Sequence, residues 1–157
     1  MDSIELELKK ALKKIEQNLE MFGTLSPSDF NHEDISLLYS LAVSLYEREE
    51  YSEAKNFFQR LILSRSHEKK FWMGLGACEQ MMKSYEDALT RWAFVSFLDS
   101  HDPSPHFHAA ECYLALDQIE QAHLAANQAK QLAENKSEHK GLLEKIDLLE
   151  KKWLILR

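Results

Sequence analysis

The fold of this chain is decided by residues 35–68, ISLLYSLAVSLYEREEYSEAKNFFQRLILSRSHE. The same arrangement of small and large apolar residues returns in residues 69–102 and again in residues 103–136, so the pattern repeats every 34 residues without an insertion. A period of this length is typical of tetratricopeptide repeats, in which each unit is a hairpin of two helices. The sequence therefore predicts an all-α protein built from three such hairpins.

Small residues recur where the two helices of each hairpin are expected to cross. They are Ala42, Gly76 and Ala110 on the first helices and Ala54, Ala88 and Ala122 on the second helices. Larger residues, which are Leu38, Tyr51 and Phe58 in the first unit, are expected to fill the space toward the next hairpin. One hairpin cannot bury its apolar face alone, so the three units should stack as a short superhelix with a shared core.

Apolar periodicity and turn residues give approximate bounds for the helices. We expect the first helices near 33–48, 69–82 and 104–116, and the second helices near 52–64, 86–98 and 119–133. Ser52 and Ser84 are the expected N-caps, and Ser84 with Asp87 has the spacing of a capping box. The third unit is degenerate, because Ile119 and Ala126 stand where the other units carry aromatic residues.

Two further helices are expected to flank the repeats. Residues 3–22 and residues 137–156 each carry an apolar stripe at steps of three and four, and Ser137 is the candidate cap of the second segment. Both helices should close the open ends of the stack, and the N-terminal helix is also expected to make a dimer contact. Together these segments predict a single tetratricopeptide-repeat domain over residues 1–157.

The composition limits the partners that the chain is expected to bind. A formal net charge of −7 repels nucleic acid phosphates and anionic membrane surfaces. No apolar run approaches the roughly 20 residues that a membrane-spanning helix needs, and the acidic start lacks the apolar stretch of a signal peptide. We therefore expect a cytoplasmic protein without direct membrane insertion.

No pattern in the sequence indicates catalysis or a cofactor. Cys78 and Cys112 are expected to be buried thiols, because their helices should lie too far apart for a disulfide. His101, His106 and His108 lack further ligands at a zinc spacing, so metal binding is not expected. Glu111, one helical turn from His108, should form a side-chain pair with it. No nucleophile with its base can be named, and an enzyme is not expected.

Two runs of sequence are more specific than the repeat pattern requires. FWMGLGACEQ at residues 71–80 and FHAAEC at residues 107–112 resemble the class II type III secretion chaperones, the group of SycD and LcrH. The similarity covers about residues 33–135. It implies a cytoplasmic bacterial chaperone, linked to virulence, that keeps hydrophobic translocator proteins soluble and secretion-competent. Members of the group hold an extended client segment in the concave groove of the repeats, and they often form a homodimer through the N-terminal helical region.

The residues expected to line such a groove lie on the first helix of each unit, one face away from the packing positions. They are Tyr39, Val43, Tyr46, Lys70, Met73, Ala77, Gln80, Phe107, His108 and Glu111. Repeat proteins that grip a C-terminal carboxylate need Lys and Asn where this chain has Tyr39 and Val43, so an apolar client segment is favoured. An adaptor that joins soluble proteins of a secretion or regulatory assembly is the alternative, and an enzyme-regulating subunit is a weaker third hypothesis.

Overall fold

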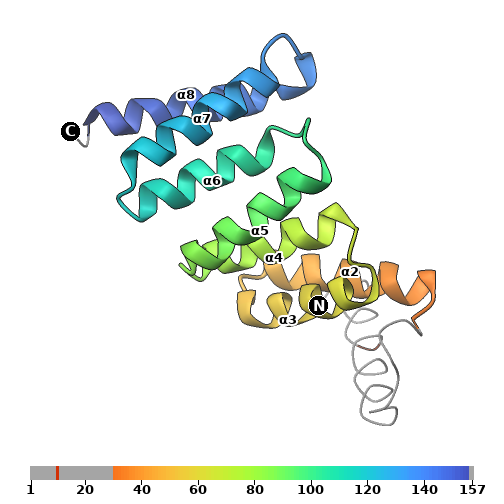
Figure 1. Cartoon of the computed structure of the whole chain (residues 1–157). Coiled ribbons are helices and arrows are strands. Elements are labelled where there is room, and N and C mark those ends of the chain that lie inside the picture. The colour runs from red at the N-terminus through yellow and green to blue at the C-terminus, as the bar shows by residue number, and fades with distance from the viewer. Residues whose placement is uncertain (1–9, 11–29, 156–157) are drawn as a thin grey trace. The chain divides into compact units, whose positions relative to one another are not determined.

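The computed structural model describes residue 10 and residues 30–155 of the 157-residue chain. The chain divides into two compact units, residues 1–71 and residues 72–157, and each unit is described by itself. Every regular element within the described residues is a helix (Figure 1), which confirms the all-α prediction. The predicted helix 3–22 lies outside the described residues, and the single domain over residues 1–157 stays a prediction.

The first unit is organised around the hairpin of α2 (His32–Glu47) and α3 (Tyr51–Ser64). The two small residues predicted at the crossing, Ala42 and Ala54, are both fully buried. Large apolar side chains surround this crossing and are buried as well, namely Leu38, Leu41, Leu45, Phe57, Phe58 and Leu61. The alternation of small and large residues therefore has the packing role that the repeat pattern predicts.

The second unit contains the remaining helices. They are α4 (Lys69–Met81), whose first residues belong to the first unit, α5 (Tyr85–Leu98), α6 (Ser104–Ala115), α7 (Ile119–Ala133), the short 3₁₀ helix η2 (Ser137–His139) and α8 (Lys140–Ile155). Helix α6 packs against α5 and α7, and α8 packs along α7 (Figure 1). All six repeat helices begin and end within one residue of the predicted bounds. Ser137 opens η2, so it does not cap α8.

The degenerate third repeat, residues 103–136, packs against its neighbour α8. Helix α7 presents a buried row of alanines, which are Ala122, Ala125, Ala126, Ala129 and Ala133. Ile146, Leu149 and Trp153 of α8 lie in the same core cluster and are buried. Small residues on α7 thus leave room for large residues on α8, which explains why the third unit does without the aromatic residues of the other two.

The three hairpins turn in the same way. Glu49, Lys83 and Asp117 are each 34 residues apart, and all three have a left-handed backbone with φ of 63°, 62° and 59°. The residue that follows each of them donates its backbone N–H to a carbonyl five positions back, as in Ser84 to Glu79 at 2.8 Å. These bonds define the Schellman motif, which usually has glycine at the left-handed position. The repeat pattern therefore extends to the backbone of its turns, without glycine.

This turn geometry overturns the predicted caps. Ser52 lies inside α3, and Ser84 occupies the N-cap position of α5 but makes no side-chain capping bond. Its backbone has ψ of 63°, whereas a capping residue needs an extended conformation. The capping box in the described residues is instead at α2, where Asn31 Oδ1 accepts from the Asp34 N–H at 2.8 Å and Asp34 accepts from the Asn31 N–H.

Candidate peptide-binding faces

The predicted groove residues of the first unit lie mainly along one side of α2. Tyr39, Val43 and Tyr46 are all half-buried, and their spacing of four and three places them on the same face of the helix. The Tyr39 ring packs against Phe58 and Phe71, with ring centroids 6.2 Å and 5.7 Å apart. We call Tyr39, Val43, Tyr46 and Lys70 the α2 face.

Lys70 completes the α2 face with a positive charge. Its ammonium nitrogen lies 4.6 Å from the centroid of the Tyr39 ring and 5.6 Å from that of Phe71, while the residue itself is exposed. Such a cation over an aromatic face contributes about 0.5–1 kcal/mol at an exposed site. The contact holds the long Lys70 side chain against the aromatic surface, so the apolar stem covers part of Tyr39 and the charge stays in water.

Met73 and Ala77 form the apolar part of the face in the second unit. Both are half-buried and pack against the core cluster of α5 and α6, whose buried members are Ala88, Trp92, Val95 and Cys112. Their exposed sides leave a small apolar surface on α4. Together with Gln80, His108 and Glu111 they make up what we call the α4–α6 face.

The polar residues of the α4–α6 face form one hydrogen-bonded network around Trp92. The Trp92 indole N–H donates to Gln80 Oε1 at 3.1 Å, and Gln80 Nε2 donates to Glu111 Oε1 at 3.2 Å. His108 Nδ1 lies 2.8 Å from the same carboxylate oxygen, and the His108 ring stacks on Trp92 at 4.5 Å. The pairing of His108 with Glu111 is confirmed. Repeat spacing gave no signal for the acceptor that the buried indole N–H of Trp92 needs.

Phe107 does not belong to either face. It is 7% exposed and lies in the core cluster that α6 shares with α7 and α8, beside Ala110 and Ile146. Phe107 was predicted to line the groove. The third repeat instead has alanines on α7, so the large Phe107 side chain from α6 fills the space. Of the ten predicted groove residues, Phe107 is thus the one that is buried in the core.

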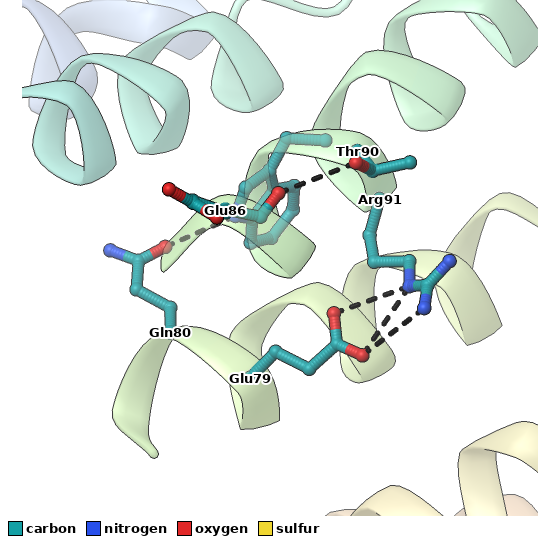
Figure 2. A network of polar contacts seen from close by, with 6 residues as sticks. Glu79, Gln80, Glu86, Thr90 and Arg91 are labelled. Carbon is teal, nitrogen blue, oxygen red and sulfur yellow. Dashed lines mark hydrogen bonds and ion pairs between the residues drawn. The ribbon is translucent and has the colours of Figure 1, made fainter. Parts of the chain in front are cut away.

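A second polar pair joins α4 to α5 next to this network, as Figure 2 shows. The Glu79 carboxylate is 1% exposed and lies between 3.2 Å and 3.4 Å from the Nε and Nη2 atoms of Arg91. A buried charge needs such a partner, because an unpaired carboxylate in the interior is strongly destabilising. Repeat spacing gave no signal for this pair, since Glu79 stands where the other two units have Leu45 and Tyr113.

The two cysteines and His106 are further titratable side chains in the described part of the chain. Cys78 and Cys112 are buried and form no disulfide within the described residues, and burial, followed by the charge of Glu111, raises the pKa of the Cys112 thiol to about 12. Burial also lowers the pKa of His106, against the opposing effect of Asp102.

Among residues 30–155, no three His, Cys, Asp or Glu side chains converge as metal ligands. Nor does any helix in this part of the chain combine the length and apolar character needed to cross a membrane.

Known proteins resemble the chain in sequence and in structure. The tetratricopeptide repeat family matches residues 37–62 and 70–102. Low calcium response locus protein H of Yersinia pestis is 31% identical over 133 residues, which are 84% of this chain and 79% of that protein.

Two solved structures of similar chains contain a translocator segment. SycD of Yersinia enterocolitica, in complex with a peptide of the translocator YopD, is 32% identical with a TM-score of 0.75, and the match covers 82% of this chain and 99% of SycD. PcrH of Pseudomonas aeruginosa was solved with the chaperone binding region of PopD. It is 27% identical with a TM-score of 0.75, over 79% of this chain and 93% of PcrH.

Proposed function

The chain belongs to the family of type III secretion translocator chaperones that includes LcrH and SycD, and from this premise we propose that it binds an extended segment of a hydrophobic translocator. The observation that carries the proposal is the half-buried aromatic and apolar surface of the α2 and α4–α6 faces. Binding takes place in the bacterial cytoplasm and keeps the client soluble and competent for secretion.

The side chains on these faces suit an extended peptide. Tyr39, Tyr46 and Met73 offer large apolar areas, and each tyrosine adds a hydroxyl that can hydrogen-bond a peptide backbone. Tyr39 is held by the rings of Phe58 and Phe71, so its position is set before a client arrives. The main entropic cost of binding then falls on the client segment, which favours a micromolar or tighter complex.

A peptide-binding assay with matched variants tests the proposal. The probes are fluorescent peptides of the YopD segment and of the PopD chaperone binding region, titrated with the full chain in fluorescence anisotropy. Tyr39→Ala and Met73→Ala remove area from the proposed faces. Phe97→Ala removes an aromatic ring from α5, where Phe97 is 78% exposed, and it serves as the matched control.

We expect at least one peptide to bind, with an affinity reduced by about tenfold or more in Tyr39→Ala plus Met73→Ala and by less than about twofold in Phe97→Ala. Circular dichroism and thermal melts establish that each variant stays folded. If no peptide binds, or if Phe97→Ala is as harmful as the double variant, the assignment of client or faces is wrong. Co-purification of a soluble partner in place of a translocator favours the adaptor hypothesis.

The oligomeric state forms a second part of the proposal. A SycD structure described as an alternative dimer, 31% identical to this chain, supports a dimer in the family. The apolar stripe of residues 3–22 includes Leu8 and Leu12, so we propose that this segment makes the dimer contact. Leu8→Asp plus Leu12→Asp should convert a dimer to a monomer in light scattering, whereas an unchanged mass places the contact elsewhere.

A further inference from the structure

The network of the α4–α6 face has a fixed direction. An indole N–H can only donate, so the Gln80 side chain must turn its oxygen toward Trp92 and its NH₂ group toward Glu111. Gln80 therefore reaches Glu111 as a donor, and the orientation of its amide is set by chemistry. Because Trp92 is 2% exposed, its indole cannot turn to water for another acceptor.

Both donors of this network reach the same oxygen of Glu111. Gln80 Nε2 and His108 Nδ1 lie 3.2 Å and 2.8 Å from Oε1, and the Glu111 side chain is 35% exposed. Within the described residues, Glu111 has these two partners and no Lys or Arg. When His108 is neutral, the carboxylate keeps its full negative charge and one oxygen with free acceptor capacity.

The carboxylate of Glu79, on α4, differs from that of Glu111 in its burial and in its partner. Glu79 is 1% exposed, and its charge is balanced within the fold by Arg91. Glu111 is held in place by Gln80 and His108, and it has no Lys or Arg partner among the described residues. A half-exposed carboxylate that is positioned but not neutralised is suited to accept a charge-assisted hydrogen bond from a ligand, and this bond is stronger than one between neutral groups.

We propose that Glu111 makes the α4–α6 face selective for client segments that carry a lysine or arginine where the peptide passes α6. This inference rests on the proposed function and names a specificity-determining residue within it. Met73 and Ala77 take the apolar residues of the segment, and Glu111 takes the basic one. Because Oε1 already has two donors, the contact uses Oε2 alone, so Lys and Arg serve equally well despite the two-pronged geometry of Arg.

A scan of the client peptide tests the proposal. Each position of the YopD segment, and of the PopD region, is replaced in turn by Lys, Arg or the uncharged isostere norleucine. Binding of every peptide is measured with the wild-type chain, with Glu111→Gln and with Glu111→Lys. Glu144→Gln is the matched control, because Glu144 is an exposed carboxylate on α8, away from the α4–α6 face.

We expect one position at which Lys and Arg peptides bind the wild-type chain about five- to tenfold more tightly than the norleucine peptide. In Glu111→Gln this ratio should fall below about twofold, and in Glu111→Lys it should invert, so that the norleucine peptide binds more tightly than the Lys and Arg peptides. The ratio should also shrink as salt rises, since it is electrostatic. Glu144→Gln should keep the wild-type ratio.

The possible failures are separable. If peptides bind but no position of the scan prefers a basic residue on the wild-type chain, Glu111 has only a structural role in the network and the inference is wrong. The same conclusion follows if a preference exists and Glu111→Gln retains it. If no peptide binds the wild-type chain at all, the proposed function itself is contradicted.

Discussion

Gly76 shows how closely two helices of the second unit approach. An ideal Cβ atom built on Gly76 would lie 3.1 Å from Cε2 of the Trp92 ring and 3.2 Å from Cβ of Arg91. Both neighbours are fixed, Trp92 by its bond to Gln80 and Arg91 by its pairing with Glu79. The contact partner at this crossing is therefore the Trp92 ring, and the absence of a side chain at residue 76 allows the ring to lie against α4.

Replacing Gly76 with alanine should destabilise the fold. Overpacking costs about 1–3 kcal/mol, and the gain in helix propensity of up to about 1 kcal/mol offsets only part of it. Gly141→Ala in α8 is the control, because an ideal Cβ atom on Gly141 has no neighbour within 4 Å, so a small gain in stability is expected there. Urea unfolding of both variants gives the comparison, and a Gly76→Ala chain as stable as wild type would contradict the close packing.

The raised pKa of the Cys112 thiol makes the stability of the fold depend on pH. Its pKa in the folded chain is raised to about 12, from an ordinary value of 9.0. The contribution of the neutral thiol is therefore complete below pH 9.0 and is lost as the pH rises toward 12, at up to about 1.4 kcal/mol per pH unit. Cys112→Ala should flatten this decline in urea unfolding at alkaline pH, and an unchanged slope would show that the thiol does not take part.

At the scale of the element, the helix ends carry charged residues where glycine is usual. Lys83 has φ of 62°, a conformation that is unfavourable for a residue with a side chain. Lys83→Gly should therefore raise stability by about 0.5–1 kcal/mol. Met81→Gly, in the last turn of α4, should lower it, because that residue is helical. Thermal melts that show the two variants moving in the same direction would contradict the assigned turn.

The start of α2 gives a prediction about capping. Asn31→Ala removes the side-chain acceptor of the Asp34 N–H and should cost about 0.5–2 kcal/mol. Ser84→Ala, at the N-cap position of α5, should change stability by no more than a few tenths of a kcal/mol, because Ser84 makes no capping bond. Chemical denaturation followed by circular dichroism distinguishes the two positions, and an equal loss at both would show that Ser84 caps its helix in solution.

At the scale of the whole molecule, replacing a buried aromatic residue and replacing an exposed one should affect the stability of the fold differently. Phe107→Ala opens a cavity in the core of α6, α7 and α8 and should cost about 3–5 kcal/mol. Phe97→Ala should leave the melting temperature nearly unchanged, since the side chain is 78% exposed. Differential scanning calorimetry makes the comparison, and a loss of peptide binding in Phe107→Ala is informative only at temperatures where that variant is folded.

The repeat pattern predicted the helices well, because 34-residue spacing and the small residues at the crossings are local features of the sequence. Ala42, Ala54, Ala88, Ala110 and Ala122 are all fully buried, as the predicted crossings require. Spacing along one helix predicted the pairing of His108 with Glu111, since residues three apart meet on one side of a helix. Residue type and spacing did not predict that Ser84 fails as a cap, because the failure depends on a backbone angle set by the preceding turn.

The sequence by itself determined the helical class, the register of the repeats and the family resemblance, because all three depend on residue type and spacing along the chain. The tertiary structure decided which side of each helix is covered. It placed Phe107 in the core, since α8 packs over the alanines of α7, and it joined Gln80, Trp92, His108 and Glu111 into one network. Contacts between distant helices depend on how side chains fill a shared volume, and spacing along one helix does not contain that information.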